Sequence, residues 1–163
     1  MRRIDARLTL MQVKPADDQA MLRALALAKE SALHGEIPVG SVLLSKSGEV
    51  LAESGNQNES SFDPTGHAEI SVIRTAAAKL KSARLDGCTL VVTLEPCPMC
   101  AGAAMQARIA RLVFGADNKD YGAVGSKFDV VRDSRLPHQM EVVANVRADE
   151  AKKLLDEFFA NKR

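Results

Sequence analysis

The segment Pro96-Cys97-Pro98-Met99-Cys100-Ala101 organises the rest of the chain. An apolar run rich in β-branched residues, Thr89 to Leu94, comes directly before it, and a helical pattern that extends to Arg108 follows. This order predicts a buried strand that leads into a helix, with two thiols at the helix start. The segment Pro64-Thr65-Gly66-His67-Ala68-Glu69 comes earlier in the chain and adds an imidazole and a carboxylate.

Length and composition limit the kinds of protein this can be. The chain has 163 residues, of which 46% are hydrophobic and 26% charged, and its formal net charge is +1. These values are typical of a soluble globular domain that buries its own core. We divide the chain into an N-terminal extension, residues 1–16, and a single domain, residues 17–163. Because the net charge is small, any binding of nucleic acid must depend on local basic clusters.

The cysteines indicate a reducing compartment. Cys88, Cys97 and Cys100 make an odd and low number, which is not typical of a secreted disulfide framework. Polar residues interrupt the N-terminal segment, so we expect no signal peptide. No apolar run approaches the roughly 18 residues that cross a bilayer. The sequence therefore predicts a cytoplasmic protein that does not enter a membrane.

The hydrophobic periodicity alternates between helical and strand patterns along the chain. We expect helices at residues 15–34, 66–80, 97–108 and 149–159. We expect strands at residues 37–44, 49–53, 88–94, 111–115 and 141–146. Strands that alternate with helices predict an α/β sandwich with a sheet of about five strands.

Three local patterns carry predictions of their own. Thr65 is expected to cap the second helix, whose buried stripe would consist of Ile70, Ile73, Ala77 and Leu80. Gly40 is either an ordinary strand glycine or bulge, or a position where the backbone approaches a ligand closely. The polar loop at residues 55–66 is long for a connection without its own structure, which favours a functional role.

Two cysteines and a histidine indicate a zinc site. Zinc takes thiolate sulfur and imidazole nitrogen in tetrahedral geometry, with four protein ligands in structural sites and three plus water in catalytic ones. His67, Cys97 and Cys100 stand at two helix starts, where the helix dipoles favour thiolate. Cys88 and His138 lie too far along the chain to be convincing fourth ligands. The sequence therefore predicts one catalytic Zn²⁺ with water in the fourth position.

Glu69 stands two residues after His67. Residues at this spacing do not share a face of a helix body, but in the first turn both side chains can reach over the helix end. Glu69 could then act on the activated water as a general base and on the leaving group as a general acid. The alternative is that Glu69 only completes a capping box. For the two cysteines, a redox pair or a purely structural zinc are the alternatives.

These residues also carry a family resemblance. His67-Ala68-Glu69 with Pro96-Cys97-Pro98-Met99-Cys100 is similar to the H-x-E…P-C-x-x-C signature of the zinc-dependent nucleoside and base deaminases. From about residue 20 to the C-terminus the chain resembles the bacterial tRNA-specific adenosine deaminases, in segments such as Glu36-Ile37-Pro38-Val39-Gly40, Asp63-Pro64-Thr65, Phe114-Gly115-Ala116, Gly122-Ala123-Val124-Gly125-Ser126 and Phe158-Phe159.

The resemblance implies both a fold and an activity. The fold would be cytidine-deaminase-like, a three-layer α/β/α sandwich with a mixed sheet. The activity would be hydrolytic deamination of the wobble adenosine, position 34 of a tRNA anticodon, to inosine by zinc-activated water. His67, Cys97 and Cys100 would hold the zinc, and Glu69 would move the proton. The partners would be a tRNA anticodon stem-loop and a second copy of the chain, whose interface would include residues near 101–108.

The resemblance also assigns substrate contacts to Asn56, Pro96, Asn118, Lys119, His138 and Phe158. The amide of Asn56 offers both a donor and an acceptor to a purine edge, although an ordinary turn residue is the alternative for this position. The backbone near Pro96 would line the base pocket. The other positions would contact RNA, although Lys119 and its basic neighbours can equally be solvated loop charges.

This chain departs from the family pattern at several positions. Gly66 stands where the family commonly has alanine, and Asn118 where it usually has an acidic residue. Asp120 replaces a lysine, so that Lys119 is displaced by one, and Pro137-His138 replaces an Asn-His pair. An amide at residue 118 can donate as well as accept, so we expect it to discriminate RNA from DNA less sharply than a carboxylate does.

Two other functions stay open at this point. The first is a free purine base or nucleoside deaminase, similar to guanine deaminase, which would keep the zinc site and lack an anticodon surface. The second is a zinc-stabilised binding module without catalysis. Glu69 argues against the second function, because a structural zinc site has no use for that carboxylate.

Overall fold

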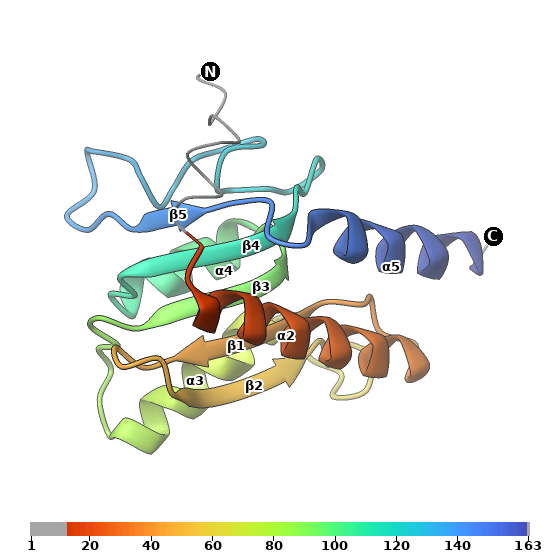
Figure 1. Ribbon diagram of the computed structural model, residues 1–163, viewed down its shortest axis with the longest axis horizontal. Helices are drawn as coiled ribbons and strands as arrows, with labels where there is room; N and C mark the ends of the chain where they lie inside the picture. The colour runs from red at the N-terminus through yellow and green to blue at the C-terminus, as the bar shows by residue number, and fades with distance from the viewer. Residues whose placement is uncertain (1–12, 163) are drawn as a thin grey trace.

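The computed structural model describes residues 13–162, and it shows a mixed five-stranded sheet between two layers of helices (Figure 1). The strand order is β2-β1-β3-β4-β5; β1 is antiparallel to β2 and β3, whereas β3, β4 and β5 are parallel. The strands are β1 (Gly40–Leu44), β2 (Val50–Gly55), β3 (Thr89–Leu94), β4 (Arg111–Ala116) and β5 (Glu141–Val143). The predicted α/β sandwich is confirmed.

Two helices cover each face of the sheet. The helices are α2 (Pro15–Leu33), α3 (Ala68–Leu80), α4 (Pro98–Gln106) and α5 (Ala148–Ala160). Helices α2 and α5 lie on one face, and α3 and α4 lie on the other (Figure 1). Alternate residues of β3 divide between the two cores: Leu90 and Val92 pack towards α3 and α4, and Val91 packs towards α2. Burial on both faces explains why this strand is almost continuously apolar.

A buried ion pair attaches the start of α2 to the sheet. The Nη1 atom of Arg111, at the start of β4, lies 2.6 Å from Oδ1 of Asp17 in the first turn of α2. Both side chains are almost fully buried, and the Nε atom of Arg111 also lies 3.3 Å from Oε1 of Glu141 in β5, so this guanidinium joins α2 to two strands of the sheet. Of the predicted extension, residues 1–12 lie outside the described part, and Pro15 and Ala16 belong to α2.

Several predicted boundaries are wrong, for local reasons. Strand β1 begins at Gly40 and not at Ile37, because Pro38 has no N–H to donate and the Val39 N–H turns back to the Ile37 carbonyl. Strand β5 ends at Val143, and Asn145 and Arg147 have left-handed backbones (φ 63° and 52°) that are incompatible with a continued strand.

The predictions for helix α3 also need correction. Its N-cap is His67, and the Thr65 hydroxyl instead donates to Asp63 Oδ1 at 2.7 Å. Of the predicted stripe, Ile70 is buried, whereas Ile73 and Ala77 are only partly buried against the core. The most deeply buried residues of the helix are Ala68, Val72 and Ala76. Leu80, predicted as a buried residue, is 46% exposed because the helix extends beyond the sheet at that end.

Gly40 is required by packing between a strand and a helix. A Cβ atom built at this residue would lie 1.9 Å from the Ala24 carbonyl oxygen and 2.9 Å from the Ala28 nitrogen, both in the backbone of α2. The close approach at this position is therefore to the chain's own helix and not to a ligand, and it allows α2 to lie directly against β1.

None of the helices in residues 13–162 is both long enough and apolar enough to span a membrane.

We predict that Gly40→Ala destabilises the protein strongly. The new methyl group would push α2 away from β1, and overpacking of this kind costs about 1–3 kcal/mol or more. Urea denaturation measures the free energy of unfolding of parent and variant. A variant as stable as the parent would contradict the contact between Gly40 and α2.

Candidate zinc centre

Four chain segments meet at one edge of the sheet. Strands β3 and β4 are parallel and end together, with Leu94 opposite Ala116, and β1 begins beside the end of β2, with Gly40 opposite Gly55. The segments that continue from these ends are therefore neighbours, and in open α/β sheets the carboxyl ends of strands are the usual position of binding sites. This edge carries Asn56, His67 and Cys97.

The three predicted zinc ligands come together there. Nδ1 of His67 lies 3.3 Å from Sγ of Cys100 and 3.6 Å from Sγ of Cys97. All three ligand atoms lie within 4.8 Å of one another. With Zn–S near 2.3 Å and Zn–N near 2.0–2.1 Å, a tetrahedral ion would hold sulfur and nitrogen about 3.6 Å apart. The spacing of the three atoms thus fits one zinc ion and identifies Nδ1 as the coordinating nitrogen.

The surroundings of the two thiols shift their pKa values in opposite directions. A hydrogen bond from Cys100, supported by one with His67, lowers the pKa of Cys97 to about 4, although partial burial opposes this shift. The same interaction with Cys97, together with burial, raises the pKa of Cys100. The hydrogen bond with Cys97 also raises the pKa of His67, although burial opposes this shift. Zinc needs both sulfurs deprotonated, so its binding releases the proton of Cys100.

Glu69 lies beside these ligands in the first turn of α3. Its side chain is buried, and it interacts with the His67 ring and the Cys100 thiol. Burial raises the pKa of Glu69 to about 7, because the carboxylate loses hydration there. A carboxyl group that titrates near neutral pH can both accept and donate a proton at that pH, as the predicted role of Glu69 requires.

Asn56 supports the helix that carries His67 and Glu69. Its Oδ1 atom accepts a hydrogen bond of 2.9 Å from the backbone N–H of Ala68, the first residue of α3. Its own backbone is fixed by the Val39 carbonyl and the Ser31 hydroxyl. The amide therefore caps α3 from a separate loop, and its Nδ2 donor makes no hydrogen bond with the described residues.

Glu95 organises the other side of the site, and the sequence analysis did not identify it. One carboxylate oxygen accepts the backbone N–H groups of Val124 and Ser126, each at 3.0 Å. The other oxygen accepts the N–H of Asn118 at 3.0 Å and the hydroxyl of Ser126. This fully buried carboxylate thus holds the segment 118–126 against Pro96. A charged residue at the end of a buried strand, two positions before Cys97, was the available signal.

Asn118 and Pro96 both form hydrogen bonds with the loop that Glu95 holds. The Oδ1 atom of Asn118 accepts the Tyr121 N–H at 3.0 Å, and its Nδ2 atom lies 3.5 Å from the Glu95 carbonyl oxygen. The amide thereby closes a turn of its own loop, whereas the RNA-selectivity hypothesis needs it to face a ribose. Pro96 is buried, and its carbonyl accepts the Ala123 N–H. Lys119 is exposed.

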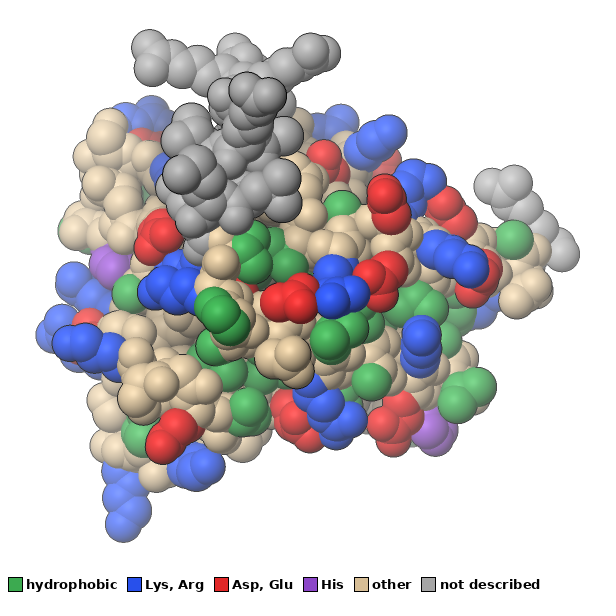
Figure 2. All heavy atoms as spheres, viewed as in Figure 1, with side chains coloured by type: hydrophobic (Ala, Val, Ile, Leu, Met, Phe, Trp, Pro, Cys, Tyr) green, Lys and Arg blue, Asp and Glu red, His purple; other side chains and the backbone are tan. Residues whose placement is uncertain are grey.

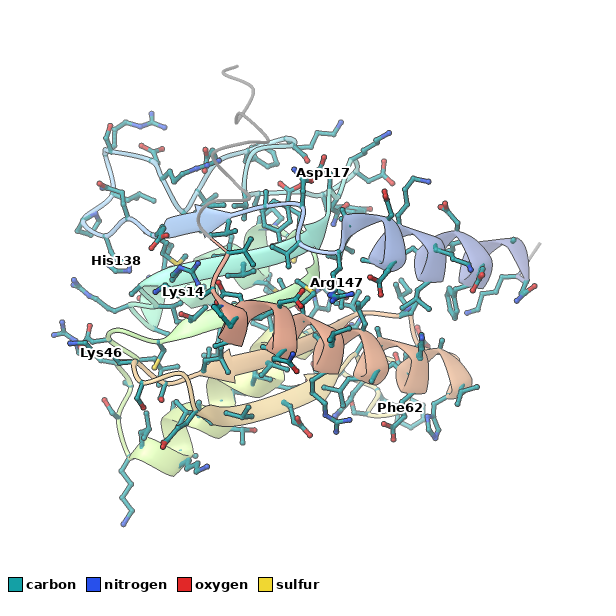
Figure 3. All side chains as sticks on the ribbon, viewed as in Figure 1. Lys14, Lys46, Phe62, Asp117, His138 and Arg147 are labelled. Atoms are coloured by element: carbon teal, nitrogen blue, oxygen red, sulfur yellow. The ribbon has the colours of Figure 1, made fainter. Side chains whose placement is uncertain are left out.

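The remaining predicted contacts lie farther from the zinc ligands. Phe158 is half-buried near the end of α5, with the ammonium of Lys162 4.5 Å from its ring centre. His138 lies near the start of β4, where its Nε2 atom is 2.7 Å from the Ile109 carbonyl oxygen. Figure 3 shows it at the opposite end of the sheet from Phe62 of the loop before α3. Within one chain, His138 does not reach the zinc ligands.

Comparison with known proteins identifies relatives of this chain. Residues 14–116 match the family described as the cytidine and deoxycytidylate deaminase zinc-binding region. A tRNA-specific adenosine deaminase of Haemophilus influenzae is 43% identical over 93% of this chain and 88% of its own length. A tRNA(Ile)-lysidine synthase of Deinococcus deserti is 46% identical over 92% of this chain, which spans only 28% of that longer protein.

A solved structure agrees with these relatives. It comes from work on A-to-I editing by tRNA:A34 deaminases at the wobble position of transfer RNA, and it is 40% identical to this chain. The match has a TM-score of 0.81 and covers 84% of this chain and 99% of the other. The predicted fold class is confirmed by this likeness.

We predict that the protein binds one zinc ion per chain through His67, Cys97 and Cys100. The variant Cys97→Ala should lose most of its zinc, because two ligands remain and the thiolate is absent. Cys88→Ala is the matched control, since Cys88 is buried in the core and outside the ligand cluster. Elemental analysis of the purified proteins measures the metal. Equal zinc in all three proteins would refute the ligand assignment.

We predict that Glu95→Gln loosens the segment 118–126. In the parent, each carboxylate oxygen of Glu95 accepts hydrogen bonds from N–H or hydroxyl donors. In the variant, one of these oxygens is replaced by an NH₂ group, which cannot accept them. Each buried donor that is left without an acceptor costs about 1–3 kcal/mol. Amide hydrogen exchange within this segment should speed up roughly tenfold or more. Exchange in α2 is the internal reference and should not change. Unaltered exchange at Val124 and Ser126 would show that Glu95 is dispensable for the loop.

Proposed function

This chain belongs to the cytidine and deoxycytidylate deaminase family, and from that premise we propose that it converts adenosine 34 of a tRNA anticodon to inosine by hydrolytic deamination. The observation that carries the proposal is the position of Glu69, buried beside three side chains whose spacing fits one zinc ion. The choice of substrate is supported by the high identity to proteins named as tRNA-specific adenosine deaminases over nearly the whole chain.

The reaction replaces the amino group at C6 of adenine with oxygen. A water oxygen bonds to C6, the C6–N bond breaks, and ammonia leaves. Zinc, when bound by His67, Cys97 and Cys100, supplies Lewis acidity that makes water a nucleophile at neutral pH. Glu69 accepts a proton from the water and delivers it to the departing nitrogen, which its pKa of about 7 allows in both directions.

Asn56 and Pro96 are assigned to the adenine ring. The free Nδ2 donor of Asn56 is available to an acceptor on the purine edge while Oδ1 stays on Ala68. Pro96, fixed to Ala123 through its carbonyl group, presents a rigid wall to the base. Glu95 and Asn56 are positioning residues in this scheme, because each fixes backbone beside the site.

The RNA surface is assigned to the sheet edge around the site and not to the α2/α5 face. Figure 2 shows acidic and basic side chains interspersed over that face, so its charge gives phosphates no continuous basic path. At the edge, the exposed Lys119 is assigned to a phosphate, and Phe158 with Lys162 to a nucleotide of the anticodon loop.

A homodimer is part of the proposal. A groove of about 220 Å³ lies along α4 and is lined by Gly102, Met105, Gln106, Arg108, Val130, Leu136, Pro137 and His138. It combines the α4 residues expected at an interface with His138, which does not reach its own chain's zinc ligands. Contact through this groove gives His138 a place at the subunit boundary. Thiol ligands and a tRNA substrate both favour the cytoplasm as the site of action.

We predict that Glu69→Gln greatly slows deamination and retains zinc. Loss of general acid–base catalysis should lower kcat by about 10²–10⁴-fold, because the amide cannot accept the proton. The assay incubates parent and variant with an unmodified tRNA that carries adenosine 34, and in parallel with free purine bases including guanine. Inosine in the tRNA and released ammonia measure turnover.

The two arms of this experiment separate the candidate functions. Inosine at position 34 without turnover of free bases supports the proposed reaction. Ammonia from guanine with unaltered tRNA would instead identify a purine base deaminase. Full activity of Glu69→Gln would refute the catalytic role of Glu69.

A further inference from the structure

The aromatic side chains of this protein are mostly on its surface. The chain has five phenylalanines, one tyrosine and no tryptophan. Only Phe114 is buried in the core, whereas Phe62, Tyr121, Phe128 and Phe159 are exposed. Phe62 is the extreme case, with 93% of its surface exposed. An aromatic ring is among the largest sources of hydrophobic stabilisation when buried, so its placement in water gives up that contribution.

The loop that presents Phe62 is held from inside the protein. The buried carboxylate of Glu36 accepts the backbone N–H groups of Ser60 at 2.8 Å and Glu59 at 3.2 Å. Asp63, the residue after Phe62, donates its N–H to the Asn58 carbonyl at 3.0 Å. These bonds fix the loop on both sides of Phe62, so the ring stands on a firm support.

The backbone of Phe62 is strained. Its φ angle is 52°, in the left-handed region that glycine adopts readily and that bulky side chains rarely occupy. No packing of the Phe62 ring offsets this strain, because the ring lies in solvent. Strained residues that do not serve the fold concentrate at functional sites.

Phe62 also lies close to the zinc centre. It precedes His67 by five residues, which limits the separation to about 18 Å even for an extended chain. The chain is in fact turned, since the Gly66 N–H donates to the Asp63 carbonyl at 2.9 Å. Figure 3 shows Phe62 beyond the end of α2, on the side of the sheet edge that carries the site.

The surroundings of Phe62 select the kind of contact it makes. Glu59 and Asp63 are its acidic neighbours in the loop; Glu59 is exposed, and the Asp63 carboxylate accepts hydrogen bonds from Thr65 and lies 4.0 Å from the Arg74 guanidinium. The Phe62 ring itself carries no charge for a phosphate to bind, and its exposed flat face suits the face of a nucleobase. Unpaired bases of single-stranded RNA are commonly held by stacking on exposed aromatic rings.

We propose that Phe62 stacks on an unpaired base of the anticodon loop next to the target adenosine. This inference rests on the proposed tRNA substrate and adds a specific residue for its recognition. Phe62 is a substrate-binding residue in this scheme: it holds a neighbouring nucleotide, and thereby the strand, while the adenine enters the zinc site.

The test measures RNA binding without turnover. Zinc-loaded Glu69→Gln protein is titrated into a fluorescent anticodon stem-loop RNA that carries adenosine 34, with and without Phe62→Ala. Loss of one stacked base should raise Kd roughly tenfold or more. Phe62→Trp should retain binding, and Phe62→Leu should lose it, because a leucine has no ring to stack. Leu80→Ala is the matched control, an exposed apolar residue at the other end of α3, and should bind like the parent.

Abasic RNAs identify the stacked nucleotide. Removal of the base that Phe62 contacts should weaken RNA binding by the parent and leave RNA binding by Phe62→Ala unaltered. The abasic RNA and Phe62→Ala together should therefore raise Kd no more than either change alone. If every abasic RNA loses the same factor with both proteins, the ring stacks on no base and the inference is wrong.

A stability measurement separates stacking from a structural role. Phe62→Gly relieves the left-handed strain and removes no packing, so its Tm should equal or exceed that of the parent while its RNA affinity falls. A lower Tm would show that Phe62 supports the fold, and a change in sedimentation would show that it covers a partner subunit; either result overturns the inference.

Unaltered RNA affinity of Phe62→Ala also overturns the inference, and leaves deamination of tRNA by the parent untouched. A parent that neither binds nor edits the RNA refutes the proposed function itself.

Discussion

The site depends on one buried carboxylate and the four donors that surround it. Glu95 leaves the end of β3 and binds the N–H groups of Asn118, Val124 and Ser126 and the Ser126 hydroxyl. A buried acid is tolerated only when its oxygens are fully hydrogen-bonded, which this segment achieves by folding around it. Gly122 is part of the fit, because a Cβ there would lie 2.5 Å from the carboxylate. The wall next to Cys97 is thereby fixed.

The opposite wall is built in the same way. Glu36 is buried beneath the loop before α3 and binds its backbone N–H groups as Glu95 binds those of its own loop. Burial opposes ionisation of Glu36, but hydrogen bonds from the backbone of Ser60 and Glu59 outweigh it and lower its pKa. Two irregular segments therefore have defined shapes without regular secondary structure, and both border the zinc ligands. Such preorganisation is what precise positioning of a base requires.

The sequence revealed the parts of this structure that depend on local patterns. His67, Cys97 and Cys100 were identifiable because ligand chemistry and spacing suffice, and the sheet was predictable from alternating apolar runs. Features that depend on distant contacts were missed or left open. Gly40 needs the backbone of α2 to explain it, Glu95 needs a loop more than twenty residues away, and the helix cap on Ala68 comes from Asn56 rather than from the adjacent Thr65. Hydrogen bonds across the fold leave little trace in a linear pattern.

Asn56 links two tasks that could have been separate. The Oδ1 end of its amide holds the first turn of α3, and with it the directions of the His67 imidazole and the Glu69 carboxyl group; the Nδ2 end is the one proposed to contact the base. A substitution of Asn56 therefore also removes the hydrogen bond that holds the start of α3 beside the zinc ligands. In the proposed scheme, base specificity can change more easily in the two flanking loops than at residue 56, because the buried carboxylates of Glu36 and Glu95 preserve the course of these loops when other residues in them vary.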